Sequence, residues 1–226
     1  MNINQTIKQQ LINGQISLKK IIDWISFTEK NNTIDTVQNY LLRLIQDLNN
    51  EKLEHKVKII YDLEQFYQKY SQYHWQVMVI LTHFVQNHTG YVTGEIPTDI
   101  QAALTVIGRR DSSQDEEQLD LSYTDIRGAN LAGANFPLTN LYQVNLSGAN
   151  LTGANLSGVI LSAANLCGAN LAGANLCEAI LCAANLAGAN LTGANLQRAN
   201  LYLATLQGAS LNDATLDGAN LREAKL

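Results

Sequence analysis

The second half of the chain carries a large apolar residue at every fifth position, from Leu121 to Leu226. Twenty of these 22 positions are leucine, and the other two are Ile126 and Phe136. A second position, two residues before each of them from 124 to 224, is alanine in 17 of 21 units. The typical unit is A-N-L-x-G, as in residues 149–153, and its register never slips.

A period of five matches neither elementary secondary structure. An α-helix repeats its faces every 3.6 residues and a strand every two, so leucines five apart would be spread over all faces of either element. Asparagine and glycine in every unit also oppose a continuous helix. The period is satisfied if each unit forms one side of a closed coil and glycine permits the turn before the next side. The sequence therefore predicts a solenoid with the large and small apolar residues inside and the other three positions outside.

These units resemble the pentapeptide repeat family of bacteria, including cyanobacteria. The resemblance implies a right-handed quadrilateral β-helix with 20 residues in each coil. At a coil spacing of ~4.8 Å, the repeat would form about five coils and a rod of roughly 25 Å. A leucine-rich repeat solenoid is the alternative, but it needs units of 20–29 residues with internal L-x-x-L-x-L spacing. That pattern is absent from this sequence.

With 20 residues in each coil, the outward positions stack in columns, and most asparagines form such columns. Stacked amides can hydrogen-bond along the rod. One column departs from this pattern, because Ile160 and Ile180 replace asparagine on consecutive coils, and Cys177 and Cys182 are close to Ile180 in sequence. We interpret these four residues as a small apolar contact patch, with drift in a tolerant repeat as the alternative.

The three cysteines, Cys167, Cys177 and Cys182, all follow a core leucine and are predicted to face solvent. Units five apart lie on adjacent sides, which disfavours the ~5.5–6 Å Cα separation of a disulfide. Free thiols fit a reducing cytoplasm, which is the expected location. Glu178 and Arg198, which are 20 residues apart, are expected to stack as an exposed ion pair of little energetic value.

The first half of the chain has a different composition, because residues 1–118 hold 11 of the 15 aromatic residues. Apolar residues at helical spacing predict helices there, with a break near Ser71 and with Gly108 as the C-terminal cap of the last helix. The predicted helices cover about 17–25, 33–48, 53–67, 75–85 and 97–108.

The charged segment that follows is predicted to be a solvated linker. The chain is thus expected to have an α+β architecture. Its parts are an all-α helical domain at 1–108, a polar linker at 109–118 and the β-helix at 119–226.

Two segments of the helical domain, 74–85 and 96–110, resemble the region just upstream of the repeats in many bacterial pentapeptide repeat proteins. Such relatives often carry transmembrane helices further upstream, but residues 1–50 are too polar to span a bilayer. The start of the chain also lacks the pattern of a signal peptide. A net charge of −5, spread over both halves, predicts no attraction to nucleic acid or to anionic lipid.

No catalytic, metal or cofactor site is expected from the side chains present. His83 and His88 are a poor fit to one helix face, and no H-E-x-x-H motif occurs. The aromatic residues, including Trp24, Trp75 and the tyrosines of 61–73, are expected in the core or between the two domains. All four histidines lie in the helical domain: His55, His74, His83 and His88.

The function expected from these observations is a non-enzymatic structural or protein–protein interaction module with an unknown protein partner. The alternative, which the resemblance implies, is a DNA-mimicking regulator of DNA gyrase. Duplex DNA carries about one charge per 1.7 Å, or roughly 15 over such a rod, whereas the repeat has six acidic and four basic residues. Leu226 is itself a core position, so a homodimer through the C-terminal end of the β-helix, or a frayed last coil, is also expected.

Overall fold

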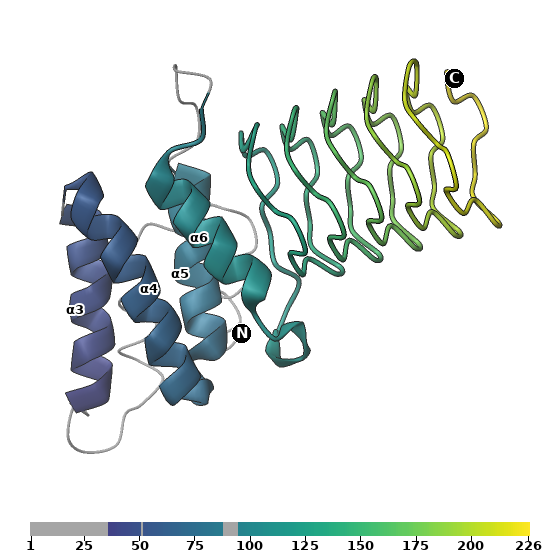
Figure 1. The fold of residues 1–226 in the computed structure, drawn as a ribbon. Helices are drawn as coiled ribbons and strands as arrows, with labels where there is room; N and C mark the ends of the chain where they lie inside the picture. The colour runs from purple at the N-terminus through teal and green to yellow at the C-terminus, as the bar shows by residue number, and fades with distance from the viewer. Residues whose placement is uncertain (1–35, 51, 88–94) are drawn as a thin grey trace, which may run out of the picture.

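The computed structural model describes residues 36–50, 52–87 and 95–226, and the helix expected at 17–25 lies outside these ranges. Within these ranges, four α-helices are packed beside the first turns of a coil that continues to residue 226 (Figure 1). The helices are α3 (Thr36–Asn50), α4 (Leu53–Lys69), α5 (His74–Asn87) and α6 (Thr98–Arg109).

The helices bury the residues that the helical spacing predicts. Leu41 and Ile45 of α3, Ile60 and Leu63 of α4, and Met78 of α5 have no exposed surface. The interruption expected near Ser71 is a single 3-10 turn, Ser71–Tyr73, between α4 and α5. Of the aromatic residues expected in the core, Tyr67, Tyr73 and Trp75 are buried, whereas Tyr61 is 36% exposed and Trp24 lies outside the described residues.

The coil is held together by isolated parallel β-bridges between residues 20 apart. One series of bridges links Asn130 to Asn150, Asn150 to Asn170, and Asn170 to Asn190. Each turn of the coil therefore contains 20 residues and four bridge positions, and its turns stack as Figure 1 shows. Within the described residues of the repeat these bridges do not extend into longer strands.

Backbone hydrogen bonds between turns follow the same register. The amide of Leu151 donates to the carbonyl of Asn170 at 2.7 Å, and the amide of Gly153 donates to Ala172 at 2.9 Å. In the return direction the Asn170 amide donates to Ala149 at 2.9 Å. Each unit thus pairs its backbone with the turns on both sides, which satisfies polar groups that lie beside the apolar interior.

The interior consists of the leucine and alanine positions, as the sequence predicts. Leu151, Leu166 and Ala169 are fully buried, and the same holds with small deviations from Leu121 to Leu206. Burial decreases toward the C-terminal end, where Leu226 is 77% exposed. The amides of the leucines in the last turn have no following turn to donate to within the described residues, so this end of the coil is open.

Asparagine forms the predicted ladders along the outside of the coil. The side-chain amide of Asn150 donates to Asn130 Oδ1 at 3.1 Å, and that of Asn190 donates to Asn170 Oδ1 at 3.0 Å. The Oδ1 atom of Asn150 accepts from the backbone amide of Thr152, two residues on, at 3.2 Å. Asn150 therefore fixes its local turn through Oδ1 and links it to the neighbouring turn through its NH2 group.

Gly108 has a different role from the predicted cap. Helix α6 continues through Arg109, and the residue after it, Arg110, is the C-cap. A Cβ atom at Gly108 would lie 2.8 Å from the Cβ of Ala134, in the first turns of the β-helix. The Gly108 carbonyl also accepts from the Asn135 amide at 2.8 Å. Glycine is required at this position because the helix and the coil approach each other closely here, and not because the helix ends.

We expect Gly108→Ala to lower the free energy of unfolding by about 1–3 kcal/mol through overpacking against the coil. An alanine at an unobstructed helical glycine would instead raise it by roughly 0.5–1 kcal/mol. Denaturant unfolding followed by circular dichroism measures the sign. The double variant Gly108→Ala/Ala134→Gly removes the obstructing methyl group and should recover most of the loss. A single variant more stable than the wild type would contradict the close approach.

Candidate interaction surface

One side of the β-helix carries the residues that the sequence singles out. Ile160 and Ile180 form a β-bridge with each other, and Ile180 is 39% exposed. Cys182 follows in the same unit as Ile180 and is half-buried. Cys177 belongs to the preceding unit, whose bridge residue Asn175 pairs with Asn155 and Asn195, so it lies on the neighbouring side. The structure thus brings three of the four expected patch residues onto one side and separates the fourth.

The same side carries further apolar residues at a spacing of 20. We call this side the apolar strip. It consists of the bridge residue and the two turn residues of six stacked units, and it excludes the core leucine that follows each bridge residue. The strip contains all three tyrosines of the repeat, Tyr123, Tyr142 and Tyr202, and it also contains Leu203. The strip comprises the outward residues of 120–123, 140–143, 160–163, 180–183, 200–203 and 220–223.

The residue type at one turn position of the strip also differs from that at the same position in other columns. The second turn residue of every unit in the repeat has a positive φ. On the strip none of these six residues is glycine, and their φ values lie between 53° and 60°. Glycine predominates at this position in two of the other columns, as at Gly148 and Gly153, but in the column of Leu138 it occupies only two of five positions. A left-handed conformation costs a residue with a side chain roughly 1–2 kcal/mol. The strip bears this cost in all six units, and the column of Leu138, Glu178 and Arg198 bears it in three of five.

Several strip residues present large apolar surfaces to solvent. Tyr123 is 68% exposed and Leu203 is 43% exposed. The rings of Tyr123 and Tyr142 pack edge to face with their centroids 5.4 Å apart. The guanidinium of Arg222 lies 5.8 Å from the centroid of Tyr202. A row of exposed apolar residues along one side is typical of a protein-binding surface.

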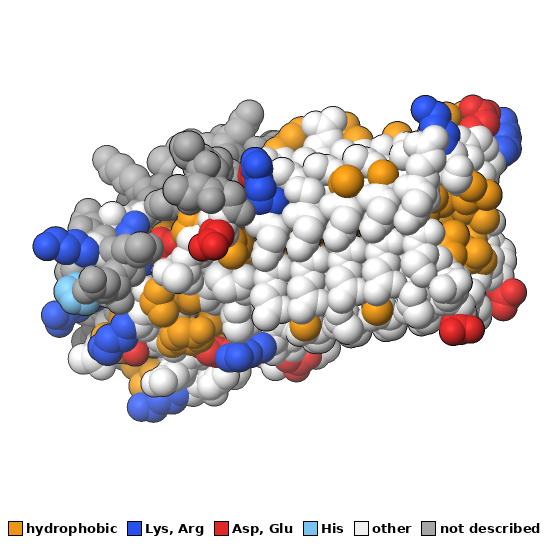
Figure 2. Space-filling model, turned by 45° about the horizontal axis from the view of Figure 1, so that its top comes forward, with side chains coloured by type: hydrophobic (Ala, Val, Ile, Leu, Met, Phe, Trp, Pro, Cys, Tyr) orange, Lys and Arg blue, Asp and Glu red, His pale blue; other side chains and the backbone are white. Residues whose placement is uncertain are grey.

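Charged side chains are sparse along the rest of the β-helix. Figure 2 shows one face of the coil on which uncharged groups lie between charged residues gathered at the two ends. Near the start, Arg127 Nε donates to Asp125 at 2.9 Å, and this hydrogen bond lowers the pKa of the Asp125 carboxyl. The predicted stacking of Glu178 on Arg198 is confirmed, with 3.3 Å between Glu178 Oε1 and Arg198 Nη1.

A buried polar cluster joins the helices to the β-helix. Arg110 Nε donates to Asp115 at 2.9 Å, and His74 Nε2 lies 3.3 Å from the same carboxylate. Arg110 Nη1 donates to the carbonyls of Ile107 at 3.1 Å and Asn135 at 2.6 Å. The Arg110 side chain is 0% exposed and that of Asp115 is 12% exposed. The prediction of a solvated segment at 109–118 is therefore wrong for these two residues, which tie α5, α6 and the first turns of the coil together.

The surroundings of this cluster are aromatic. The ring of Tyr67 meets that of His74 edge to face at a centroid distance of 5.2 Å. Burial raises the pKa of the Tyr67 hydroxyl. Arg110 also lies 5.8 Å from the ring centroid of Phe136, the large core residue of an early unit. The cluster is packed on all these sides, so its arrangement fits a structural junction and not a substrate site.

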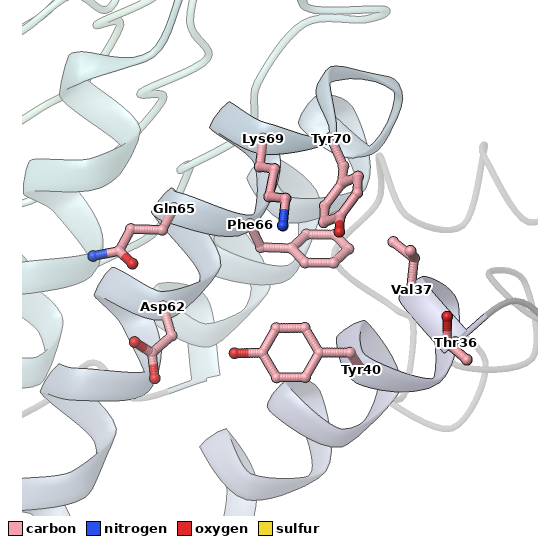
Figure 3. A pocket seen from close by; sticks show the side chains of 8 residues that line it. All are labelled: Thr36, Val37, Tyr40, Asp62, Gln65, Phe66, Lys69 and Tyr70. Atoms are coloured by element: carbon pink, nitrogen blue, oxygen red, sulfur yellow. The ribbon is translucent and has the colours of Figure 1, made fainter.

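The helical part holds an open cavity of about 360 Å³ between α3 and α4. Figure 3 shows the Tyr40 and Phe66 rings beside it, and the Tyr40 hydroxyl points toward the side of Asp62. The Asp62 carboxylate lies 3.4 Å from Lys58 Nζ in an ion pair on the surface of α4. The complete lining is Thr36, Val37, Tyr40, Asp62, Gln65, Phe66, Lys69 and Tyr70.

In residues 36–50, 52–87 and 95–226, no three His, Cys, Asp or Glu side chains converge closely enough to hold a metal ion. Over the same ranges, no helix combines the length and the apolar character that crossing a bilayer requires. The three cysteines are free thiols, with Cys167 exposed and the other two half-buried.

Comparison with known proteins agrees with this arrangement of stacked five-residue units. The family model for pentapeptide repeats matches eight copies, over residues 120–158, 160–198 and 199–226. The chain belongs to the pentapeptide repeat family, and its repeat is a right-handed β-helix preceded by helices. No curated protein matches the chain.

Solved structures of the same family are similar to the chain. A pentapeptide repeat protein (Rfr23) from the cyanobacterium Cyanothece 51142 is 41% identical, with 43% of this chain and 63% of that chain covered and a TM-score of 0.33. One from Nostoc PCC 7120 is 33% identical, with 43% and 84% covered and a TM-score of 0.38. One from the thylakoid lumen of Arabidopsis thaliana is 32% identical, with 46% and 70% covered and a TM-score of 0.20. The match thus spans somewhat less than two thirds of the first of these proteins.

Sequence reasoning found part of the strip and missed the rest. Ile160 and Ile180 were visible because they interrupt an asparagine ladder. Tyr123, Tyr142 and Leu203 occupy turn positions at which the sequence varies, so no ladder marks them. Comparing the second turn position at a spacing of 20 would have found the strip, because only this column lacks glycine throughout.

Proposed function

We propose that this protein is a non-enzymatic protein–protein interaction module that binds through the apolar strip. The observation that carries the proposal is the set of exposed large apolar side chains on one side of the β-helix, Tyr123, Ile180 and Leu203. We further propose that the rod is a quadrilateral β-helix of about five turns, which is supported by the four bridge positions in each 20 residues. A quadrilateral rod with a filled interior offers flat sides for partners and no cleft for a substrate.

The helices would hold the rod in a fixed orientation within this module. Support comes from the buried Arg110–Asp115 pair and from the close approach of Gly108 to the coil, both of which stiffen the junction. Free thiols on the surface of the rod support a reducing compartment, and we propose the cytoplasm. The three parts expected from the sequence, 1–108, 109–118 and 119–226, belong to the same proposal.

The charge of the rod argues against the DNA-mimicking alternative. The repeat carries six acidic and four basic residues, far from the roughly one charge per 1.7 Å of duplex DNA. Three of its acidic residues, Asp125, Glu178 and Glu223, also have an arginine within ion-pair distance. Inhibition of gyrase supercoiling by micromolar protein would reverse this ranking.

Affinity capture with the full chain tests the proposal. We expect tagged wild-type protein to retain a specific protein set from the cell that produces it, and the variant Ile160→Asn/Ile180→Asn to lose it. This variant restores the asparagine ladder of the other columns, so it should fold. The control Asn150→Ile/Asn170→Ile places the same two isoleucines in another column and should retain the set. An identical set for wild type and strip variant would overturn the proposal.

A further inference from the structure

We propose that the apolar strip binds a second copy of this chain, side against side and with the two rods antiparallel. The inference rests on the proposed function, because it names the partner that the strip would bind. It is carried by the order of residues along the strip, by their spacing and by the position of the charges. The contact would be isologous, so each copy contributes the same surface.

The order of residues is nearly symmetric about the middle of the strip. Ile160 and Ile180 occupy the two central levels and pair through a bridge. Tyr142 belongs to the unit of Asn140, one level before Ile160, and Tyr202 belongs to the unit of Asn200, one level after Ile180. A two-fold axis through the middle would set the level of Ile160 against that of Ile180 in the second copy. The same axis would set the level of Tyr142 against that of Tyr202.

The spacing of the strip restricts the kind of partner that can touch every level. Its side chains repeat at the separation of bridged strands, ~4.8 Å. A surface with a different spacing would meet some levels and miss others. The strip of a second copy has the same spacing by construction, so its side chains can lie between those of the first copy along the whole length.

The charges at the two ends of the strip favour the antiparallel arrangement. The strip has only three charged residues, Asp120 at its first level and Arg222 and Glu223 at its last. Antiparallel pairing sets the level of Asp120, and of the exposed Tyr123 ring, against that of Arg222. The Glu223 carboxylate accepts from the Tyr202 hydroxyl at 3.4 Å and lies 3.9 Å from Arg222 Nη2, so Arg222 and Glu223 are paired within their own chain and the last level carries no net charge. Parallel pairing would instead set the two Asp120 carboxylates at the same level, whereas antiparallel pairing sets each of them against a level without net charge.

The described helices reach the first level of the strip but leave its tyrosine exposed. Gln86 of α5 donates to the Asp120 carbonyl at 2.9 Å, and Tyr123 is 68% exposed. In an antiparallel pair the two sets of helices would lie at opposite ends of the paired rods. A single side of a narrow rod is a small interface, at the lower end of the range for specific association, so the dimer would be weak and dependent on concentration.

Sedimentation velocity of the purified full chain over a series of concentrations tests this inference. We expect a reversible monomer–dimer equilibrium for the wild type, and a dissociation constant at least tenfold higher for Ile160→Asn/Ile180→Asn. The control Asn150→Ile/Asn170→Ile should associate like the wild type. Unchanged circular dichroism spectra and unfolding midpoints would show that the variants remain folded.

Chemical cross-linking tests the orientation in the same samples. In a Cys167→Ser/Cys177→Ser background, a short bis-maleimide should link Cys182 of the two copies, because antiparallel pairing brings the central levels together. In a Cys177→Ser/Cys182→Ser background, Cys167 lies on another side and should give no link.

Two outcomes would overturn the inference. The first is a wild type that stays monomeric up to millimolar concentration. The second is a dimer that the strip variant leaves unchanged, which would place the contact elsewhere, as at the open C-terminal turn with Leu226. A monomeric wild type that still captures a strip-dependent protein would refute the second copy and retain the proposed function. A wild type that neither dimerises through the strip nor captures a strip-dependent protein would refute both the second copy and the proposed function.

Discussion

Replacing Asp115 with alanine should lower the free energy of unfolding by about 3–5 kcal/mol, because it leaves Arg110 buried without its carboxylate. The guanidinium cannot turn to water, since the Arg110 side chain is 0% exposed. Its Nη2 atom is already buried without a hydrogen-bond partner, so the remaining polar contacts are not in excess. Equilibrium denaturation in urea measures the loss.

The matched control for this variant is Glu178→Ala. It also removes a carboxylate from an arginine, but at a pair whose side chains are 76% and 61% exposed. We expect a change of less than about 1 kcal/mol there. The double variant Arg110→Met/Asp115→Ala should recover part of the loss, because it removes the unpaired charge while leaving the carbonyls of Ile107 and Asn135 without a donor. Equal effects of the two single variants would refute a buried cluster at the junction.

The second large effect is expected in the interior of the β-helix. Leu166→Ala should cost about 2–5 kcal/mol, because this side chain is fully buried and its removal leaves a cavity between stacked turns. Leu226→Ala makes the same chemical change at the same position of the unit, where the residue is 77% exposed. We expect at most a small change there. Thermal unfolding monitored by circular dichroism compares the two.

A large loss for Leu226→Ala would have a specific meaning in the same experiment. It would indicate that the open turn at 207–226 is covered in solution, since truncating an exposed leucine costs little. Repeating the measurement at several protein concentrations would then separate an intermolecular contact from local packing. Only an intermolecular contact makes the unfolding midpoint depend on concentration.

Much of the repeat could be predicted from sequence because one physical requirement acts on every unit. A leucine such as Leu151 must point inward in each unit, and a partner such as Ala154 must let the backbone pass close to it. The period of five in the sequence is the direct consequence of this requirement. The series of bridges 20 residues apart then follows from closing the coil, although the sequence pattern alone did not give the number of sides.

The junction could not be predicted, because its contacts join residues that no local pattern connects. His74 and Asp115 are 41 residues apart, and Arg110 bonds to Asn135 across 25 residues. In sequence, a run of charged residues around 109–118 is typical of a solvated segment. The packing of α6 against the coil buries two members of this run, and the same packing explains why Gly108 lacks a side chain. The strip was partly hidden for a different reason, since its residues share a side only when compared at a distance of 20.

The register of the bridges also restricts how the length of such a rod can change in evolution. An insertion of five residues would keep every leucine inside and every asparagine outside, so the coil would still close. It would, however, move all later units by one side, and Tyr202 and Leu203 would no longer continue the row begun by Tyr123. Only insertions or deletions of 20 residues lengthen or shorten the rod with its sides intact. Selection on the interior therefore acts in steps of five, whereas selection on a surface that runs along one side acts in steps of 20.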